Sequence, residues 1–330
     1  MNVAVVILNW NGEKLLRQFL PSVLKYSQEA SVYLADNAST DDSIRCVSEE
    51  FPTVKIIQNQ HNGGYAKGYN DALKTLSEAV FVLLNSDVEV TENWLVPILS
   101  AFKNDTNLVA AQPKILDYNN KGSFEYAGAA GGFIDRLGYP FCRGRIFDTL
   151  EKDEGQFDDI KEIFWATGAC LFIKKRAFQE VGGFDEDFFA HQEEVDLCWR
   201  LQQKGGTIKY VGTSHVFHVG GATLDVANPQ KTFYNFRNTL LMLTKNVQGL
   251  QLWGILFARL LLDGVAGITF LLKGKPKHLL AIIKAHINFY MLFYKIFKKR
   301  PLKTIGFKYH FVNSIVLDYF ILKKKTFKQL

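Results

Sequence analysis

The first 110 residues alternate between two hydrophobic patterns. Short continuous apolar runs, typical of strands buried in a parallel sheet, occupy residues 3–8, 31–36, 54–58, 79–84 and 108–112. Between them, apolar residues recur at helical spacing near 65–77 and 92–104, and also after Asn11, which is expected to cap the following helix. Repeated strand–helix units of this length predict an α/β fold with a doubly wound parallel sheet. Such a sheet binds ligands at the carboxyl ends of its strands.

The pattern changes after residue 123. Shorter apolar runs between glycine-rich turns predict an inserted antiparallel region up to about residue 220, which ends in two strands, TIKYV and SHVFHV. An amphipathic helix is predicted from Glu193 to Gln203. Beyond Pro229 the chain is predicted to be helical throughout.

Polar or glycine-rich residues follow four of the predicted strands. These segments are NWNG at 9–12, DNASTDD at 36–42, HNGGY at 61–65 and NSD at 85–87. Because the carboxyl ends of parallel strands meet at one edge of a sheet, the four segments are expected to form one binding site.

Composition narrows the class of protein. Of 330 residues, 48% are hydrophobic and 22% are charged, which excludes both a disordered chain and a polytopic membrane protein. The four cysteines lie far apart, so neither a disulfide scaffold nor a structural zinc site is expected, and a reducing compartment is indicated. The first residues lack a basic segment, and their apolar run has only the length of a strand, so no signal peptide is expected.

Charge is distributed unevenly. Residues 271–330 contain fourteen lysines or arginines and one acid, whereas the remaining chain contains 25 basic and 32 acidic residues. The apolar stretch 250–272 includes Arg259 and Asp263, which are spaced to pair on one helix face. Since charges within a membrane span are costly, helices lying on an anionic membrane are favoured over a span, with a helical subdomain or dimer face as the alternative. The residues expected to meet lipid headgroups are Lys273, Lys275, Lys277, Lys298, Lys299, Arg300 and Lys323–Lys325.

Three of the strand-end motifs have both a functional and a local structural interpretation. Asp87 could hold a divalent cation on phosphate oxygens, although Asn, Ser and Asp are also common in turns. Asp36 could contact a nucleobase or ribose, and a turn is an equally good explanation. The glycines after Asn62 would let backbone N–H groups approach a phosphate. Neither a P-loop nor a dinucleotide fingerprint is present.

Two further groups contain titratable side chains. Glu193, Glu194 and Asp196 begin a predicted helix, where acids are common, but they follow the apolar segment FFAH. Burial there would raise a carboxyl pKa toward that of a general base. His218 lies on a strand that runs into glycines, where a histidine is more often structural. With Asp87 as a partner, it becomes a reasonable metal ligand.

The motifs occur in an order that resembles inverting family 2 glycosyltransferases, and in particular the rhamnosyltransferase-like branch. They are VVILNWNG, DNASTDDS, NGGYAKGYN, LLNSD, GACLFIKKRAFQEVGGFDEDFF, EEVDLCWRL and HVFHVGG, and the match covers about residues 2–245. The resemblance implies the GT-A fold, with its Rossmann-like, mostly parallel sheet, for residues 1–245. A basic, apolar helical region at 246–330 would then associate with membrane or oligomerise.

The resemblance also implies an activity. A sugar would pass from a nucleotide-diphosphate donor, a UDP- or dTDP-sugar with dTDP-rhamnose suggested by the branch, to a hydroxyl of a glycan or lipid-linked acceptor. The enzyme would serve polysaccharide synthesis for the cell envelope, as a peripheral protein at the cytoplasmic face of the membrane.

Site roles follow from the same resemblance, residue by residue. The residues matched to the donor nucleotide and its diphosphate are Asn9, Asn11, Asp36, Asn62, Gly63, Ser86 and Asp87. Asp87 would bind Mg²⁺ or Mn²⁺ together with His218, because Asn85 replaces the first acid of the family's metal motif. Glu194 stands in the place of the general base, with Glu193 and Asp196 beside it. The sugar and acceptor pocket would be shaped by Trp165, Gly168 and Ala169.

Two other hypotheses compete with this one. A nucleotide-binding oxidoreductase would need a glycine fingerprint after the first strand, which NWNG does not supply. A non-catalytic relic that binds nucleotide sugar or membrane would not need the nearly complete set of acids. Nucleic acid is not expected as a partner, because the body is acidic and the basic residues lie among membrane-like helices. The sequence leaves a homodimer open.

Overall fold

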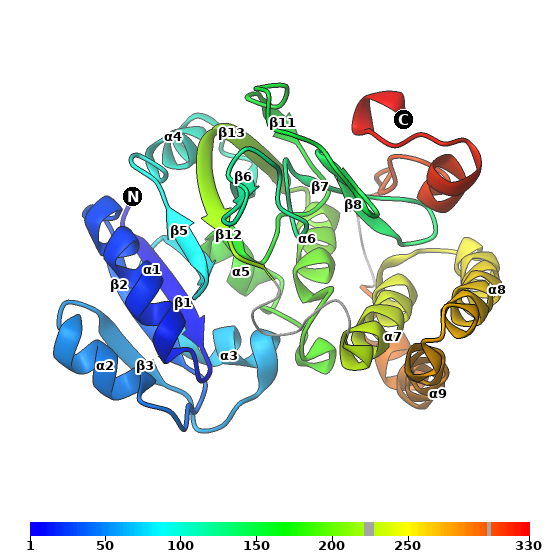
Figure 1. The fold of residues 1–330 in the computed structure, drawn as a ribbon, viewed down its shortest axis with the longest axis horizontal. Coiled ribbons are helices and arrows are strands. Elements are labelled where there is room, and N and C mark those ends of the chain that lie inside the picture. The colour runs from blue at the N-terminus through cyan, green and yellow to red at the C-terminus, as the bar shows by residue number, and fades with distance from the viewer. Residues whose placement is uncertain (221–227, 302–304) are drawn as a thin grey trace.

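A computed structural model describes residues 1–220, 228–301 and 305–330. Its centre is a mixed sheet with the strand order β11-β13-β6-β12-β4-β1-β2-β3, and β5 pairs with the far end of β13 (Figure 1). The strands of this sheet are β1 (Val3–Asn9), β2 (Ser31–Asp36), β3 (Lys55–Gln58), β4 (Val80–Asn85), β5 (Val88–Val90), β6 (Leu108–Asp117), β11 (Ile160–Glu162), β12 (Cys170–Lys174) and β13 (Thr207–His218).

The half of the sheet built from β1 to β4 is parallel, as predicted. Alternate residues of β1 point to opposite faces, so that Val5 joins a core with helices α1 and α2, while Val6 joins a core with α3. The helices of the sheet are α1 (Glu13–Tyr26), α2 (Ser43–Glu50), α3 (Gly64–Leu73), α4 (Val96–Asn104), α5 (Lys175–Glu180) and α6 (Glu193–Gln203). Both faces of the sheet are therefore covered, and its strand ends remain as the place for a ligand.

The other half of the sheet differs from the prediction in two ways. The strand β12 runs antiparallel between β4 and β6, so β6 is not the next parallel neighbour of the first four strands. The two strands predicted at TIKYV and SHVFHV are one strand, β13, whose register against β6 shifts between Val211 and His215. A bulge of this kind lets one strand bend without ending, which a hydrophobic pattern alone does not reveal.

The expected antiparallel insertion is present as a second, smaller sheet. It has the order β10-β9-β8-β7 and is formed by β7 (Gly132–Ile134), β8 (Pro140–Cys142), β9 (Arg145–Ile146) and β10 (Thr149–Leu150). Figure 1 shows it between the main sheet and the C-terminal end of the chain.

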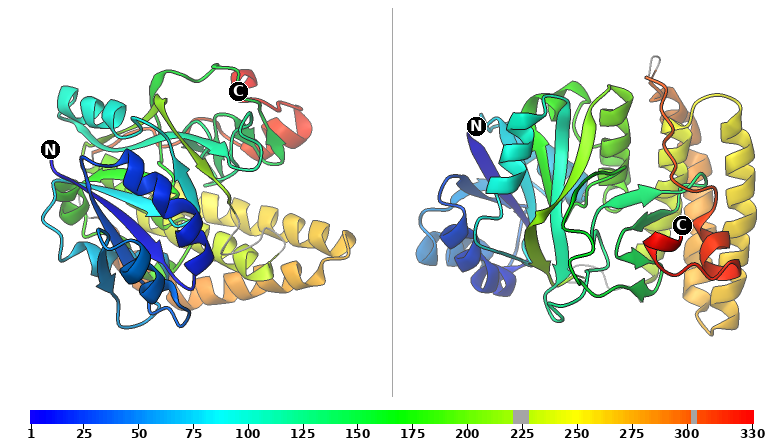
Figure 2. Two further views of the ribbon diagram at one scale, coloured as in Figure 1. Left: turned by 60° about the vertical axis from the view of Figure 1, so that its left-hand side comes forward. Right: turned by 90° about the horizontal axis from the view of Figure 1, so that it is seen from above.

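Three long helices follow: α7 (Pro229–Asn246), α8 (Gln251–Leu272) and α9 (Pro276–Lys298). α9 packs along α7 and against α8, and the views in Figure 2 show α8 and α9 side by side at the end of the molecule opposite β3. The predicted pair on α8 is confirmed, because Arg259 Nε lies 3.1 Å from Asp263 Oδ1 and both side chains are buried.

The prediction that the chain is helical throughout beyond Pro229 is wrong for residues 305–330. Only short helical turns occur there, at Leu317–Ile321 and Phe327–Gln329. Phe311 N donates to Ile134 O, and the ring of Phe327 packs on that of Phe133. The segment is extended because it pairs with and covers the small sheet.

Candidate active site

Asn9 and Asp36 stand at the ends of adjacent parallel strands, directly opposite each other in the register of β1 and β2. Asn9 Nδ2 donates to Asp36 Oδ1 at 3.2 Å, and the other carboxylate oxygen accepts from the backbone N–H of Ser39. Both side chains are buried, and Asn9 Oδ1 has no partner among the described residues. A Cβ at Gly12 would come within 2.3 Å of that oxygen and within 3.7 Å of Ser86 Oγ, so Ser86 belongs to the same corner.

Asn11 does not cap helix α1, as its position had suggested. The helix begins after Gly12 without a side-chain cap. Asn11 has a left-handed backbone (φ 53°), and its Oδ1 accepts from Thr40 N at 2.7 Å. Asn11 therefore joins the loop after β1 to the loop after β2. It lies at an exposed position, two residues after Asn9.

The amides at the start of α3 are not free for a phosphate. Asn62 Oδ1 accepts from Gly64 N, and Tyr65 N donates to Phe189 O, each within 2.9 Å. The expectation that backbone N–H groups after Asn62 approach a phosphate is therefore wrong for Gly64 and Tyr65, whose N–H groups are bonded within the protein. These bonds instead join α3 to the segment that precedes the acids of α6.

Two asparagines of this corner were missed in the sequence. Asn37 Nδ2 donates to Asn62 Oδ1 at 2.9 Å, and Asn59 Nδ2 donates to Asn37 Oδ1 at 3.1 Å. Asn37 directly follows Asp36 in the motif DNAS, which was the available signal. Asn59 follows β3 without a recognisable motif.

Asp87 and His218 meet at the exits of β4 and β13. His218 Nε2 lies 3.1 Å from Asp87 Oδ1, and the other ring nitrogen lies 3.4 Å from Glu125 Oε2. All three side chains are buried. Burial opposes charge on the imidazole, but the hydrogen bonds and negative charges of the two carboxylates outweigh it and raise the pKa of His218 to about 10. Glu125 was not predicted, because no strand end or motif marks it.

The same cluster contains two side chains that could bind a divalent cation, Asp87 and His218. Among residues 1–220, 228–301 and 305–330, no three His, Cys, Asp or Glu side chains are arranged to ligate one ion. Asp87 and His218 nevertheless face each other, with Asn85 Nδ2 3.4 Å from the ring. One carboxylate and one imidazole fit an Mg²⁺ or Mn²⁺ site that takes its other oxygens from a diphosphate and water.

Glu193 is buried and Glu194 is half-buried at the first turn of α6. One oxygen of each carboxylate has no hydrogen-bond partner among the described residues. Burial raises the pKa of Glu194 to about 7, while burial and repulsion by Glu194 raise the pKa of Glu193 well above its usual range. A carboxyl that titrates near neutrality and keeps a free oxygen is suited to accept a proton from a hydroxyl.

Asp196 belongs to a different cluster. Its oxygens bond Arg200 Nε at 2.8 Å, Lys245 Nζ at 2.9 Å and Asn246 Nδ2 at 2.8 Å. Burial alone would raise its pKa, but the charges of Arg200 and Lys245 outweigh burial and lower it. The structure therefore places this acid in an ion-pair network that joins α6 to α7, and not with the unpaired acids.

Of the three residues predicted to shape the sugar pocket, two lie between the clusters. Tyr65 Oη donates to Gly168 O at 2.8 Å, and Asn85 N donates to Ala169 O at 3.0 Å. Trp165 is buried, with its Nε1 bonded to Phe133 O, and it packs on the small sheet.

Direct contacts connect the two halves of the site. Asn85 touches His218 on one side and Ala169 on the other, and the neighbouring Gly168 is bonded to Tyr65, whose backbone holds Phe189 O. A chain of contacts thus links the end of β4, the 165–169 loop, the start of α3 and the turn before α6. Asp196, predicted as a neighbour of the base, and Trp165, predicted for the sugar pocket, are bonded elsewhere. The catalytic and donor-binding roles of the other residues stay predictions.

Comparison of the chain with known proteins identifies its family. The model of glycosyl transferase family 2 matches residues 4–182. The N-acetylglucosaminyl-diphospho-decaprenol L-rhamnosyltransferase of Mycobacterium tuberculosis is 30% identical over 233 residues, which are 65% of this chain and 75% of that one.

Two solved structures share the fold. The mannosyltransferase of Pyrobaculum calidifontis, in complex with GDP-Man and Mn²⁺, has a TM-score of 0.54 at 13% identity and covers 87% of this chain and 86% of its own. GalNAc-T7 with UDP, GalNAc and Mn²⁺ has a TM-score of 0.55 at 20% identity over 66% of this chain, which spans 43% of that larger protein. The fold therefore agrees with the family match, which covers more than half of the chain, and with the rhamnosyltransferase relative. This protein is a GT-A glycosyltransferase that belongs to glycosyl transferase family 2, in its rhamnosyltransferase-like branch.

Proposed function

We propose that the protein transfers a sugar, with inversion, from a UDP- or dTDP-sugar to a hydroxyl of a lipid-linked glycan acceptor at a membrane surface. The observation that supports this most is the pair Glu193 and Glu194, which keep unpaired carboxylate oxygens at the start of α6. The turn before them is bonded to α3, and the start of α3 is bonded to Asn37 at the end of β2. dTDP-rhamnose is the first candidate donor, because the Mycobacterium tuberculosis relative is an L-rhamnosyltransferase that acts on a diphospho-decaprenol.

Each side-chain cluster has one task in this proposal. Asp36, fixed by Asn9 and Ser39, accepts from the nucleobase or ribose with the lone pairs that these two bonds leave on its carboxylate oxygens. Glu194 takes the proton from the acceptor hydroxyl, whose oxygen attacks the anomeric carbon opposite the departing diphosphate. Glu193 stays protonated beside it, because burial and the negative charge of Glu194 both raise the pKa of Glu193 well above its usual value.

Asp87 and His218 would hold the divalent cation. A bound Mg²⁺ or Mn²⁺ would stabilise the negative charge that develops on the leaving diphosphate. Without the cation, the hydrogen bond and charge of His218 outweigh burial and hold the pKa of Asp87 below its usual value. When the cation binds, His218 would give up its proton, and the ion would stabilise the carboxylate in its place. A Lewis acid at this place suits the proposed reaction, in which no covalent enzyme intermediate forms.

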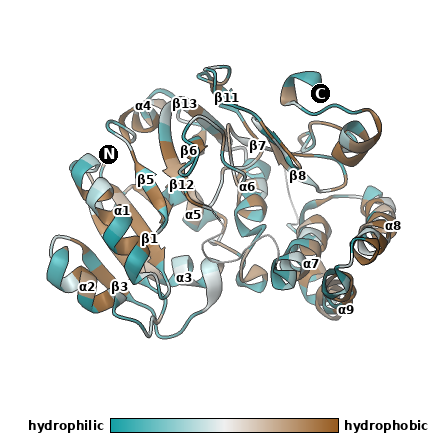
Figure 3. Ribbon diagram, viewed as in Figure 1, coloured by the Kyte–Doolittle hydropathy of each residue, from teal (hydrophilic) through white to brown (hydrophobic). Residues whose placement is uncertain are grey.

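The membrane contact rests on the outer surface of α8 and α9. Both helices are long and apolar enough to cross a membrane, and Figure 3 shows hydrophobic residues along most of their length. Arg259 and Asp263 are buried against Leu137 O, Tyr139 and His286. Because one face of α8 is held to the body in this way, we favour helices that lie on the bilayer and insert their outer face. In this division, residues 1–245 form the catalytic domain and 246–330 the membrane-associating region.

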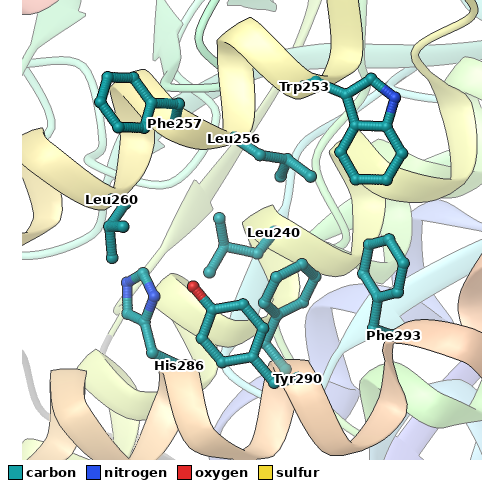
Figure 4. A pocket seen from close by; sticks show the side chains of 9 residues that line it. Leu240, Trp253, Leu256, Phe257, Leu260, His286, Tyr290 and Phe293 are labelled. Atoms are coloured by element: carbon teal, nitrogen blue, oxygen red, sulfur yellow. The ribbon is translucent and has the colours of Figure 1, made fainter.

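A groove of about 340 Å³ opens between these helices. Figure 4 shows side chains of α8, among them Trp253 and Phe257, on one side and Tyr290 and Phe293 of α9 on the other. Its apolar lining is compatible with the lipid chain of the acceptor.

Not all of the lysines expected at headgroups are free to meet them. Lys299 Nζ bonds Asp185 and Asp187 within 2.7 Å, and Arg300 donates to the Val247 carbonyl. Lys324 pairs with Asp318. The exposed lysines around the α8–α9 turn, Lys273, Lys275 and Lys277, remain for anionic lipid.

The test is a melting screen of nucleotide sugars and bare nucleotides with Mn²⁺ or EDTA, followed by a transfer assay. A ligand at about a hundred times its Kd stabilises the folded protein by about 2.7 kcal/mol, and a melting curve resolves a change of this size. The proposal expects a metal-dependent shift with a UDP- or dTDP-sugar and product with the inverted anomeric configuration. A shift by NAD(P) alone, or silence from every nucleotide with folded protein, would contradict it.

A further inference from the structure

The segment that leads into the acid pair has an unusual backbone. Phe189, His191 and Gln192 have φ angles of 61°, 68° and 72°, and none of them is glycine. Residues other than glycine rarely adopt such backbone angles, and strained residues persist only where the surrounding structure holds them. Glu193 and Glu194 follow at once, so the direction of their side chains depends on this strained turn.

One side chain from a distant helix holds the turn. Asn238 of α7 is fully buried, and its Nδ2 lies 2.9 Å from Phe188 O, 2.9 Å from Ala190 O and 2.6 Å from His191 O. Its Oδ1 accepts from Arg237 Nε at 2.7 Å. Since arginine only donates and carbonyls only accept, these contacts fix which end of the amide faces the turn.

The backbone carbonyls of the turn all accept hydrogen bonds, whereas several of its side chains have an unpaired polar atom. Arg237 Nη2 reaches the carbonyls of Asp187 and Phe188, Tyr65 N takes Phe189 O, and Asp196 N takes Gln192 O. In contrast, His191, Gln192, Glu193 and Glu194 each keep a buried polar atom without a partner among the described residues. A rigid backbone that presents unpaired polar atoms is the arrangement expected of a preorganised reaction centre.

We infer that Asn238 is the positioning residue of the catalytic base: its amide holds residues 188–191 so that Glu194 faces the acceptor hydroxyl. This inference rests on the proposed function, in which Glu194 is the base. It assigns a role to α7, which lies beyond residues 4–182 where the family model matches.

The test uses the full chain and Asn238→Asp, which keeps the shape but turns an oxygen toward three carbonyl oxygens. Thr239→Val is the matched control, because Thr239 is the next residue of α7, is buried, and donates only to Asn235 O of its own helix. Asn238→Ser, which retains one donor, serves if the aspartate variant does not fold. Hydrogen–deuterium exchange is measured over residues 187–193, and kcat and donor KM are measured with the donor that turns over in the screen above.

We expect faster exchange in this segment and a fall in kcat of about 10²-fold, since misplacement by about 1 Å costs that much. Donor KM should stay unchanged, and the control should match the wild type. Unchanged exchange, or faster exchange with unchanged kcat, would overturn the inference, as would a rise in KM alone. Glu194→Gln separates the two proposals: if that variant keeps wild-type turnover, the assignment of the base fails, whatever exchange shows for Asn238.

Discussion

Glu194 and Asp196 lie two residues apart on one helix, yet their surroundings give them opposite properties. Burial outweighs backbone hydrogen bonds and raises the pKa of Glu194 to about 7, whereas the charges of Arg200 and Lys245 keep Asp196 ionised. At neutral pH the first carboxyl can therefore exchange a proton while the second cannot. The sequence shows three acids within four residues. It does not reveal this difference, because Lys245 and Asn246 reach Asp196 from another helix.

Glu194→Gln should lower kcat by about 10²–10⁴-fold, the usual contribution of a general base. Donor affinity should hardly change, because the amide has the same shape and the proposal gives Glu194 no contact with the donor nucleotide. Steady-state transfer kinetics with donor binding by melting shift measure both quantities. Asp196→Asn is the informative comparison: it should lower stability through its ion pairs, and a larger kcat loss there than at Glu194 would reverse the assignment.

The raised pKa of Glu194 also predicts a pH profile. The base works only when ionised, so kcat should rise about tenfold per pH unit at low pH and level off above about 7. A profile of kcat between pH 5 and 9, at saturating donor and metal, measures this limb. A plateau that already begins near pH 5 would mean that the base is an acid with an ordinary pKa.

Asp87→Ala should weaken metal-dependent binding of the donor, because it removes the carboxylate that faces His218. Titration of Mn²⁺ in the presence of UDP or dTDP measures the effect. The control is Glu89→Ala, two residues along, whose partner is Lys121 at the surface and which should leave the titration unchanged. Equal titrations of wild type and Asp87→Ala would remove Asp87 from the metal site.

At the scale of elements, α3 and the turn before α6 are in close contact at Gly64 and Phe189. Gly64 has φ 77°, and a Cβ there would lie 2.5 Å from Phe189 O. The motif NGGY indicated glycines at a helix start but suggested a phosphate as the neighbour. What occupies the place is a carbonyl of the protein, 125 residues away in the chain, and local patterns carry no information on such a partner.

A pair of glycine substitutions tests this contact. Gly182 has φ 76° and nothing within 4 Å of a Cβ, so Gly182→Ala should cost only the strain of a left-handed alanine, about 1 kcal/mol of unfolding free energy. Gly64→Ala should cost more and should also lower kcat, because it displaces the Phe189 carbonyl before the acids. Denaturant unfolding together with kcat distinguishes the two. Equal stability and full activity of both variants would show that the contact does not matter.

The sequence predicted the elements best where one face or both faces of a segment are buried. The strands β1 to β4 and helix α6 lie where their patterns indicated. The antiparallel β12 between β4 and β6 was not predictable, because an apolar run is the same for either strand direction. The last residues, 305–330, were predicted as helix because no long cluster of turn residues interrupts the chain beyond Pro229, but their backbone bonds the small sheet instead.

At the scale of the whole molecule, the basic C-terminal region is part of the catalytic body as well as its proposed membrane contact. α9 packs along α7, and Lys295 and Lys299 bond Asp185 and Asp187, just before the strained turn. Removal of residues 271–330 would therefore disturb the active site and would not test the membrane contact alone. Substitutions confined to the outer face of α8 avoid this difficulty.

The triple variant Leu261→Asn, Val265→Asn, Ile268→Asn changes side chains that are 57%, 60% and 58% exposed. If they insert into lipid, each contributes about 1 kcal/mol, so binding to vesicles of anionic lipid should fall about 10²-fold. Vesicle sedimentation at two salt concentrations measures this, and wild-type binding should weaken at the higher one because the exposed lysines are screened. The matched control changes three exposed apolar residues outside this face, Val96, Ile160 and Leu150, and should bind as wild type does.

If the α8 variant binds equally well but changes from dimer to monomer in solution, the exposed face of α8 is an interface between two copies of the chain. The lipid-linked acceptor would then have to reach Glu194 by a route that does not depend on this surface.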